Sequence, residues 1–528
     1  MDTHTDLTQT GKVYLVGAGP SDPGLLTVKG YRILKQAQVV IYDALIGPGI
    51  YSLIPREAEK ISVGKRAGRH SVKQEEINRM ILEHAQKGKR VVRLKGGDPF
   101  LFGRGGEELE LLAVHQIPYE IVPGVTSAIA AAAYAGIPVT HRAAASGVHI
   151  LTGHKKQNEP LDIDFQALRQ AGGTCVVLMG MSALHEIVTG FLNAEMPPDT
   201  PAAVIGQGTG ADQRSVVATL AVLEEDVRKQ QIKAPAVIVI GQTAAFANRY
   251  AWRERLPLHN ARILITRPAE RGRKLSDLLE QLGAEVVQMP TIRTQIRDCG
   301  RQLSEQLSQI AAYQYLAFTS PAGVDYFFEL LDKLQMDVRC IGTVRLAVIG
   351  SATGEALKKR GLRPDLMPEQ YHSIALGRLL RQSMQGTGRV LLLRSSMGSR
   401  ELIDEIKQNN QQSNQKNNQQ SNQIEVTDLA IYDTLYTHQS VDLYAKTLVE
   451  SGQIAMVMFT SASSVRGFVH MTKGADYSNV RAVCIGRVTA NQAAGYGMQV
   501  YQAEKETMES MAEAAVKLQQ GRISVWSL

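Results

Sequence analysis

The sequence predicts an α/β protein built from two consecutive α/β domains. Short apolar segments rich in Val and Ile alternate with amphipathic segments along the 528 residues, as in sheets covered by helices. Glycine turns follow several of these apolar segments, where open α/β sheets usually bind ligands. The alternation restarts near residue 262 and then repeats within itself, which indicates a second domain.

The segment 91–109, VVRLKGGDPFLFGRGGEEL, is the most informative element. Its apolar start predicts a buried strand that ends in a glycine turn before a helix. Gly96 and Gly97 allow the backbone to approach a ligand, where a Cβ would clash. Asp98 follows at the carboxyl end of the strand. An ordinary strand-to-helix turn is the alternative interpretation of this segment taken alone.

A second glycine loop lies in the segment 13–30, where an apolar strand is followed by Gly17 and Gly19 and a helix near Leu25. The loop is similar to the dinucleotide fingerprint G-x-G-x-x-G, but Asp22 stands where the third glycine belongs. Pro20 also removes a backbone donor from the expected phosphate cradle. The sequence contains no P-loop motif. Together the two loops predict a small polar cofactor that is not held by phosphates.

Residues 13–243 resemble the uroporphyrinogen-III C-methyltransferases, which use S-adenosylmethionine. The resemblance implies a two-lobed α/β domain of the tetrapyrrole methylase type. It rests on an ordered series of motifs: VYLVGAGP (13–20), QVVIYDALI (38–46), VGKRAGRHSVKQEEIN (63–78), RVVRLKGGDPFLFGRGGEEL (90–109), VPGVTSAIAAAAYAGIPVTHR (122–142), LMGM (178–181) and APAVIVIG (234–241).

The resemblance implies catalytic and substrate-binding residues in this half. Asp43 is the expected proton acceptor after methyl transfer, with a helix or turn cap as the alternative. Lys65 is the expected proton donor, with a clamp for substrate carboxylates as an equal alternative. Arg66 and Arg104 are expected to bind substrate carboxylates, because guanidinium groups match carboxylate geometry. The three alanines 143–145 depart from the polar residues of the family and place substrate contact there in doubt.

The resemblance also implies the S-adenosylmethionine pocket, in which Asp98 would accept a hydrogen bond from a ribose hydroxyl or the amino group. His141, His149 and His154 have irregular spacing and no nearby carboxylate, so no metal site is expected. The expected cofactor-binding residues are Pro20, Gly96, Gly97, Asp98, Leu101, Thr126, Ser127, Met179 and Gly208.

The second half begins after a seam at 244–261, which we interpret as a linker, and it contains an internal repeat. Segment 315–328 is similar to 455–468, and segment 346–361 is similar to 482–497. Both pairs predict a strand, a turn and a helix. Two similar α/β lobes should therefore form, with the ligand between them.

The layout of residues 262–525 and the motifs ILITRP (263–268), AFTSPAGV (317–324), AVIGSATGEAL (347–357), VLLLRS (390–395), AIYDTLY (430–436), FTSASSV (459–465) and CIGRVTANQA (484–493) resemble uroporphyrinogen-III synthase. This resemblance implies two parallel α/β lobes joined by two strands and no cofactor. Tyr432 is the candidate for assisting loss of the substrate hydroxyl, although packing is the alternative role. Ser320, Ser461 and Thr489 are candidates for substrate binding. For the two serines the alternative is a simple helix N-cap that needs no ligand.

Composition limits the remaining possibilities. The net charge of +7 is scattered, so nucleic acid is not expected, and a basic surface suits either a polyanionic metabolite or plain solvation. Four cysteines without a CxxC motif favour a reducing compartment. Residues 1–12 lack an apolar signal core and should be flexible, and the Gln/Asn-rich segment 408–423 should be disordered. We expect a cytoplasmic protein without a membrane partner.

The combined hypothesis is a bifunctional enzyme of tetrapyrrole biosynthesis. It would cyclise hydroxymethylbilane to uroporphyrinogen III with inversion of ring D, and then methylate C2 and C7 to give precorrin-2 for sirohaem or cobalamin. One alternative is a methyltransferase whose second half only binds tetrapyrrole, and another is a methyltransferase for a later precorrin. The methyltransferase family suggests a homodimer.

Overall fold

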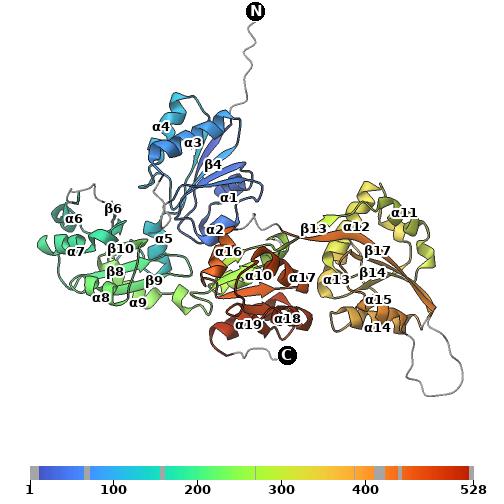
Figure 1. Cartoon of the computed structure of the whole chain (residues 1–528). Coiled ribbons are helices and arrows are strands. Elements are labelled where there is room, and N and C mark those ends of the chain that lie inside the picture. Colours follow the sequence, from blue (N-terminus) through green and yellow to red (C-terminus); the bar gives the residue numbers. More distant parts are fainter. Residues whose placement is uncertain are drawn as a thin grey trace, which may run out of the picture. The chain divides into compact units, whose positions relative to one another are not determined.

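The computed structural model divides into two compact units, Met1–Pro290 together with Gln439–Leu528, and Thr291–His438. Among the described residues the first unit contains three five-stranded sheets and the second contains one (Figure 1). The structure describes residues 11–64, 72–154, 161–267, 269–385, 387–408, 423–437 and 443–522.

The first sheet is entirely parallel and has the strand order β3-β2-β4-β1-β5. Helices α1 and α2 cover one face through Leu34 and Ile50, and α3 and α4 cover the other through Ile81 and Leu112. Burial on both faces explains why β1 and β4 are apolar over most of their length. The elements are β1 (Val13–Gly17), α1 (Val28–Leu34), β2 (Val39–Tyr42), α2 (Pro48–Ser52), β3 (Glu59–Ser62), α3 (Gln74–Gln86), β4 (Val91–Lys95), α4 (Gly105–Val114) and β5 (Tyr119–Val122).

The second sheet, of order β6-β7-β10-β8-β9, is mixed, because only β6 and β7 run parallel. Helix α5 packs on one face through Ala128 and Ala131, and α7 and α8 pack on the other through Ile187 and Leu223. The elements are α5 (Ser127–Tyr134), β6 (Val148–Thr152), α6 (Phe165–Ala171), β7 (Thr174–Leu178), α7 (Leu184–Asn193), β8 (Pro201–Gly206), β9 (Arg214–Thr219), α8 (Leu223–Lys229), β10 (Ala236–Ile240) and α9 (Ala247–Tyr250).

The third sheet is parallel, has the order β12-β11-β18-β19-β20, and belongs to the same unit. Helices α10 and α19 bury Leu279 and Met511 on one face, while α17 and α18 bury Phe468 and Ala490 on the other. The elements are β11 (Arg262–Ile265), α10 (Ala269–Gln281), β12 (Glu285–Gln288), α16 (Leu443–Glu450), β18 (Met456–Phe459), α17 (Ala462–Met471), β19 (Arg481–Cys484), α18 (Arg487–Ala494), β20 (Gln499–Gln502) and α19 (Met508–Gln519).

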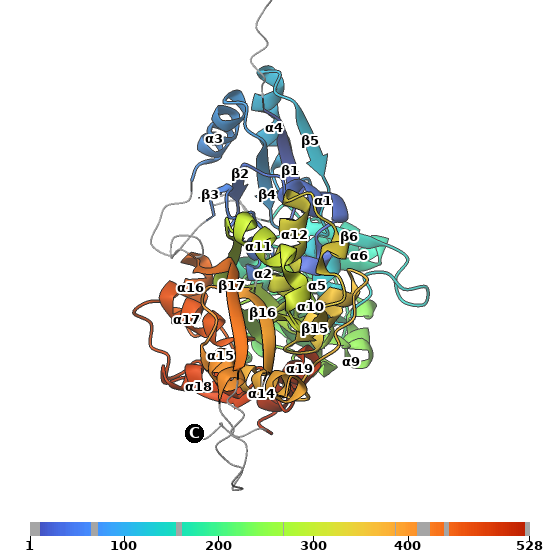
Figure 2. The same ribbon diagram turned by 90° about the vertical axis from the view of Figure 1, so that its right-hand side faces the viewer.

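The second unit holds the fourth sheet, of order β13-β17-β16-β14-β15, in which only the edge strand β13 is antiparallel to its neighbour. Figure 2 shows its long strands β16 and β17 side by side. The elements are β13 (Ile292–Ile296), α11 (Gly300–Ser308), β14 (Tyr315–Phe318), α12 (Pro321–Lys333), β15 (Arg345–Val348), α13 (Ser351–Lys358), α14 (Ser373–Ser383), β16 (Thr387–Ser395), α15 (Glu401–Lys407) and β17 (Gln423–Tyr436).

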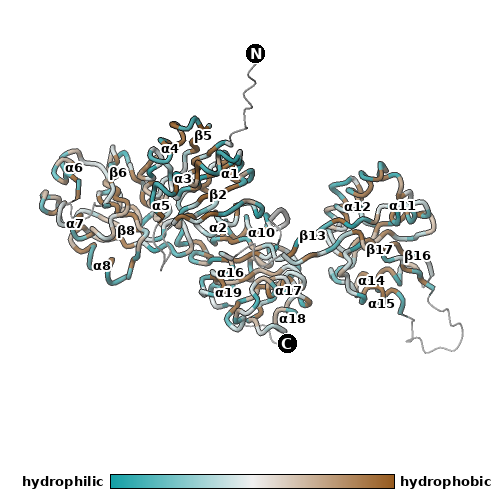
Figure 3. The backbone as a smooth tube through the Cα atoms, turned by 45° about the horizontal axis from the view of Figure 1, so that its top comes forward, coloured by the Kyte–Doolittle hydropathy of each residue, from teal (hydrophilic) through white to brown (hydrophobic). Residues whose placement is uncertain are grey.

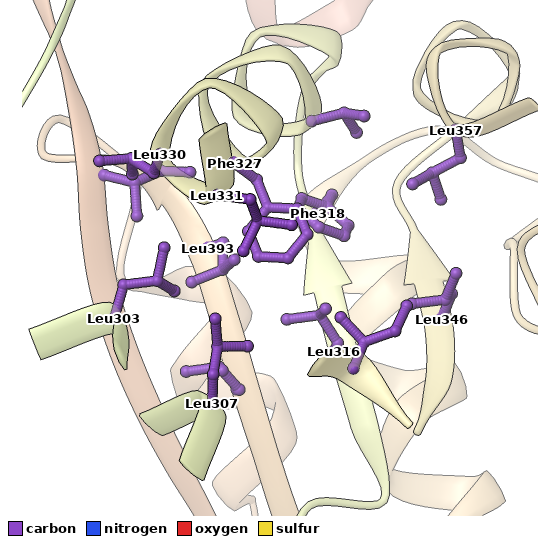
Figure 4. Packing of buried hydrophobic residues seen from close by; sticks show 14 of the residues in the cluster. Leu303, Leu307, Leu316, Phe318, Phe327, Leu330, Leu331, Leu346, Leu357 and Leu393 are labelled. Carbon is purple, nitrogen blue, oxygen red and sulfur yellow. The ribbon is translucent and has the colours of Figure 1, made fainter. Parts of the chain in front are cut away.

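Two apolar layers sandwich this fourth sheet. On one face Phe318 meets Phe327 of α12 edge to face, with ring centroids 5.5 Å apart (Figure 4). On the other face Leu376 of α14 and Leu402 of α15 pack against the strands. Figure 3 shows that apolar and polar segments alternate along the chain. Short 3-10 helices connect elements of both units: η1 (Pro23–Leu25), η2 (Met181–Ala183), η3 (Gln242–Phe246), η4 (Arg253–Arg255), η5 (Ile310–Ala312) and η6 (Val338–Ile341).

The predicted internal repeat is confirmed. The order β14-α12-β15-α13 in one unit matches β18-α17-β19-α18 in the other, and each strand pair is parallel. The N-cap residues agree closely, with φ/ψ of −165°/155° at Ser320 and −166°/155° at Ser461. Similar sequence therefore produces the same local geometry in both lobes.

Three further sequence predictions concern membrane helices, cysteines and the segments expected to be flexible or disordered. None of the described helices is long and apolar enough to cross a membrane. All four cysteines are free, and burial raises the pKa of Cys175 to about 11 and that of Cys484 to about 12. Apart from its ends Gln408 and Gln423, the Gln/Asn-rich segment lies outside the described residues, as do residues 1–10.

Candidate active sites

The two predicted glycine loops meet at the carboxyl ends of β1 and β4. The Gly97 N–H donates to the Gly19 carbonyl at 2.9 Å, and the Gly19 N–H donates to the Gly97 carbonyl at 3.2 Å. Both glycines have positive φ, +72° at Gly19 and +70° at Gly97, which side chains adopt only with strain. The sequence located both loops, and the fold joins them.

A third glycine loop completes this contact; sequence analysis placed its Thr126 and Ser127 in the cofactor pocket but did not select Gly124. A Cβ on Gly124 would lie 2.2 Å from the Gly97 carbonyl oxygen and 2.7 Å from the Gly17 Cα. A Cβ on Gly17 would lie 2.5 Å from the Gly124 Cα. Three backbones therefore touch without side chains between them. The sequence signals for this loop were its place after a strand, in VPGVT, and its family-like motif 122–142, but neither pointed to Gly124 itself.

Asp98 organises these loops. One carboxylate oxygen accepts from the Phe100 N–H at 2.8 Å and the Leu101 N–H at 3.2 Å, and the other accepts from the Gly124 N–H at 2.9 Å. These bonds tie the second loop to the third. The predicted hydrogen bond to a ribose or amino group is not tested by this arrangement.

Asp22, at the position where the dinucleotide fingerprint has glycine, has a structural role. Its carboxylate accepts from the Gly24 N–H at 2.7 Å and caps η1, so the α-helix begins only at Val28 rather than near Leu25. Its other oxygen accepts from the Tyr134 hydroxyl at 2.7 Å. Burial and the nearby Asp22 carboxylate raise the pKa of Tyr134 well above its ordinary value. Asp22 thus links the first glycine loop to α5.

Asp43 follows β2 and lies at one end of a network of charged side chains. Its carboxylate accepts from the Arg93 guanidinium at 2.5 Å, and the Arg93 Nε donates to Glu108 at 3.0 Å. Lys95 donates to the same Glu108 oxygen at 2.7 Å. Arg93, Lys95 and Glu108 are buried, whereas the Asp43 side chain keeps 27% of its surface exposed. A ligand can therefore reach Asp43 but not the groups behind it.

The pKa values of Arg93 and Lys95 follow from burial and from the neighbouring charges. Burial opposes the charge on Arg93, but Asp43 and Glu108 hold its pKa above the ordinary value. Burial and then the Arg93 charge lower the pKa of Lys95, against the attraction of Glu108. Sequence analysis did not select Arg93 and Lys95 of β4 or Glu108 of α4, because the residue pattern alone does not distinguish a buried charged side chain from an exposed one.

The remaining predicted cofactor residues lie on loops around α5. The Thr126 hydroxyl accepts from a backbone N–H of the first turn at 3.3 Å and caps the helix, which begins at Ser127. A Cβ on Gly208 would lie 2.5 Å from the Ala131 Cβ, so the 207–213 loop packs closely on α5. Met179 has φ +53° at the end of β7 and a side chain that is largely exposed. Pro20 lies in the first glycine loop.

Of the predicted substrate contacts in this half, Lys65 and Arg66 lie outside the described residues. Arg104 is exposed, has φ +58° and forms a bidentate pair with Glu107 at 2.8 and 2.5 Å. Its guanidinium is thus fixed next to the second glycine loop. Within the described part of the chain, no group of three or more His, Cys, Asp or Glu side chains has a geometry suited to a metal ion.

In the second unit the structure brings two predicted residues together. The Tyr432 hydroxyl shares a hydrogen bond of 2.8 Å with the Ser320 hydroxyl, which also accepts from the Gly323 N–H at 3.0 Å. The Tyr432 ring, 5% exposed, packs 5.3 Å from the Tyr326 ring. Both the N-cap interpretation of Ser320 and a packing role of Tyr432 are realised, and their predicted substrate roles stay predictions.

The matching lobe in the first unit holds the other two predicted residues. Ser461 caps α17 by accepting from the Ser464 N–H at 3.2 Å, and its hydroxyl lies 3.0 Å from that of Ser463. Thr489, in the first turn of α18, is 4% exposed. Its repeat counterpart Thr353 in α13 is buried as well. Burial at both positions favours a packing role that the sequence did not reveal.

Comparison with known proteins identifies the families that the two parts of the chain match. Residues 12–224 match the family model of tetrapyrrole (corrin/porphyrin) methylases, and residues 273–513 match that of uroporphyrinogen-III synthase HemD. A "Porphyrin biosynthesis protein HemD" of Ruminiclostridium josui is 40% identical over 513 residues, which cover 97% of this chain and 99% of that protein. The chain belongs to this family of fused proteins.

Fused tetrapyrrole methylase–synthase proteins thus combine uroporphyrinogen-III synthase with S-adenosylmethionine-dependent uroporphyrinogen-III C-methyltransferase, and this chain carries both parts. An "S-adenosyl-L-methionine-dependent uroporphyrinogen III methyltransferase" of Methanosarcina barkeri is 51% identical over 232 residues, 44% of this chain and 91% of that protein. A solved uroporphyrin III C-methyl transferase of Thermus thermophilus is 40% identical, covers 44% of this chain and 99% of that chain, and has a TM-score of 0.39.

Proposed function

We propose that the synthase part of this chain cyclises hydroxymethylbilane to uroporphyrinogen III with inversion of ring D, and that the methyltransferase part adds two methyl groups to give precorrin-2. The strongest support for methyl transfer is the three-loop glycine contact at the carboxyl ends of β1 and β4. The partly exposed Asp43 carboxylate follows β2, the neighbour of β4 in the same parallel sheet. The repeated lobes support the cyclisation.

The cofactor proposal rests on the close backbone approach. With no Cβ at Gly17 or Gly124, the three loop backbones pack directly on one another, and a Cβ on Gly97 would meet only the Ser127 nitrogen, at 3.9 Å, which leaves room beside Gly97 for a small polar group. Met179, the α5 start and the 207–213 loop would complete a pocket on the second lobe. Bound S-adenosylmethionine would supply the methyl group. The protein's own contribution is to align the reactants and exclude water.

For the proton that leaves the methylated carbon, we assign Asp43 as the acceptor. Arg93 donates to one Asp43 oxygen at 2.5 Å, which orients the carboxylate. We assign Lys65 as proton donor or carboxylate clamp, and Arg66 and Arg104 as carboxylate ligands, on the strength of the family resemblance. Asp43→Asn should lower the rate of methyl transfer at saturating cofactor about 100-fold or more, with cofactor affinity unchanged.

For the cyclisation, we assign the hydroxyl pair of Tyr432 and Ser320 to the substrate hydroxyl, and Ser461 and Thr489 to substrate binding in the matching lobe. Binding without cyclisation is the second candidate, because Tyr432 and Thr489 are nearly fully buried. The double variant Tyr432→Phe with Thr489→Ala separates these candidates. Unchanged formation of the type III isomer would refute both residue roles.

The deciding experiment supplies hydroxymethylbilane to the purified full chain, with and without S-adenosylmethionine. We expect type III uroporphyrinogen without the cofactor, and with it a product heavier by two methyl groups. Only the spontaneous type I isomer would refute the synthase assignment. Type III isomer without methylation would refute the methyltransferase assignment. If the methyltransferase part instead methylates only a tetrapyrrole that already carries methyl groups, its substrate is a later precorrin.

Two further proposals concern the oligomeric state and the cellular location of the protein. We propose a homodimer through the methyltransferase half, to be tested by sedimentation of the full chain, where a mass near the chain's 57.7 kDa would refute it. We also propose a cytoplasmic protein, consistent with its four free cysteines.

A further inference from the structure

A buried charge network joins the first synthase lobe to the methyltransferase part of the same unit. Glu285 and Arg262 are the first residues of β12 and β11, and they lie opposite each other in the parallel register. The Arg262 Nε donates to Glu285 at 3.0 Å, and both side chains are buried. Burial opposes the charge on Arg262, but Glu285 and Asp212 hold its pKa above the ordinary value.

The partners of this pair in the methyltransferase part all lie in the 207–213 loop. The same Glu285 oxygen accepts from the Ala211 N–H at 2.9 Å, and a second Arg262 nitrogen donates to Asp212 at 2.7 Å. A buried carboxylate that accepts from both a guanidinium and a backbone amide is a strong, directional contact. The synthase lobe therefore holds the backbone of this loop as well as one of its side chains.

The held loop continues directly into the proposed cofactor pocket. The Gln213 side chain accepts from the Thr209 N–H at 2.8 Å, and the Thr209 hydroxyl accepts from the Asp22 N–H at 3.2 Å in the first glycine loop. Gly208 packs against Ala131 of α5. Contacts thus run without interruption from the synthase strands to both sides of the pocket.

The backbone of this loop is strained, which makes an external support meaningful. Gln207 and Thr209 have φ of +51° and +72°, a conformation that non-glycine residues keep only where surrounding contacts impose it. Thr209 and Gln213 are buried and hydrogen-bonded to each other, whereas Asp212 is exposed apart from its pair with Arg262. The Glu285 and Arg262 contacts lie at the point where the loop turns back toward β9.

We propose that the synthase lobe holds the 207–213 loop in its cofactor-binding conformation, with Glu285 and Arg262 as positioning residues for S-adenosylmethionine. This inference rests on the proposed cofactor pocket. Fusion would then affect cofactor binding directly, because the synthase lobe provides a rigid support for a loop of the methyltransferase part. Both residues lie at the amino ends of their strands, whereas the Ser461 cap lies at a carboxyl end, so the support is separate from the proposed synthase residues.

The test measures S-adenosylmethionine affinity of the full chain by calorimetry, and KM and kcat for methyl transfer. Glu285→Ala should weaken binding about tenfold, about 1.4 kcal/mol, raise the KM for the cofactor in proportion, and leave kcat at saturation within about twofold. Glu285→Gln keeps an acceptor for the Ala211 N–H and should recover most of the affinity. Synthase activity should not change.

A matched control separates positioning from general destabilisation. Glu405 is also a buried glutamate paired with arginine, since Arg381 lies 3.2 Å away, but it belongs to the second unit. Glu405→Ala should lower thermal stability to a similar extent with no change in cofactor affinity. Equal losses of affinity in the Glu285 and Glu405 variants would overturn the proposal.

An additional variant covers the case in which Glu285→Ala does not fold. Asp212→Ala removes an exposed carboxylate and breaks only its bond to Arg262, and should weaken cofactor binding about threefold. If Glu285→Ala does not fold, wild-type affinity in Asp212→Ala would refute the positioning role. Failure of the wild-type chain to bind the cofactor would refute instead the proposed function on which the inference rests.

Discussion

Replacing Gly124 with alanine offers a direct test of the three-loop glycine contact. The added Cβ would lie 2.2 Å from the Gly97 carbonyl oxygen and 2.7 Å from the Gly17 Cα. Both neighbours are backbone atoms, so neither can rotate away as a side chain would. Relief requires the loops to separate by about 1 Å, and overpacking of this kind costs about 1–3 kcal/mol. The rigid neighbours place the cost at the upper end.

If the proposed pocket binds S-adenosylmethionine, a cost of about 3 kcal/mol in the binding conformation weakens affinity by roughly 100-fold. Calorimetry on the full chain measures this loss, and type III isomer formation by the same sample reports whether the synthase part remains folded. Gly106→Ala is the matched control, because its Cβ would meet nothing within 4 Å. Wild-type affinity in Gly124→Ala would refute the assignment of this contact to the cofactor.

Three further predictions concern the buried groups. Glu108→Ala leaves the buried Arg93 without one of its carboxylates and should lower the free energy of unfolding by about 3–5 kcal/mol in urea titrations; a loss below about 1 kcal/mol would contradict the network. Phe327→Ala empties a fully buried site and should cost about 3–5 kcal/mol by the same measurement, with methyltransferase activity retained. Tyr432→Phe removes the 2.8 Å bond to Ser320 and should cost about 1 kcal/mol while lowering the ratio of type III to type I isomer; an unchanged ratio argues against a catalytic role.

The residues of the proposed sites differ in how far sequence alone could identify them. Gly97 and Gly19 were visible because a glycine after an apolar strand is a local signal. Gly124 follows a strand too, but its importance depends on the two backbones that it touches. Arg93 and Glu108 could not be distinguished from surface charges, because their burial results from the central position of β4 and from α4 packing over it.

The sequence by itself determined the order of strands and helices, the glycine turns and the repeated lobes, because apolar periodicity and turn residues act within a few positions of the chain. Only the tertiary structure decided which turns meet, which charges are buried, and that Glu285 of the synthase lobe holds the backbone of the 207–213 loop. Such contacts join residues far apart in the chain. They depend on how sheets and helices pack around a shared core, which no local pattern records.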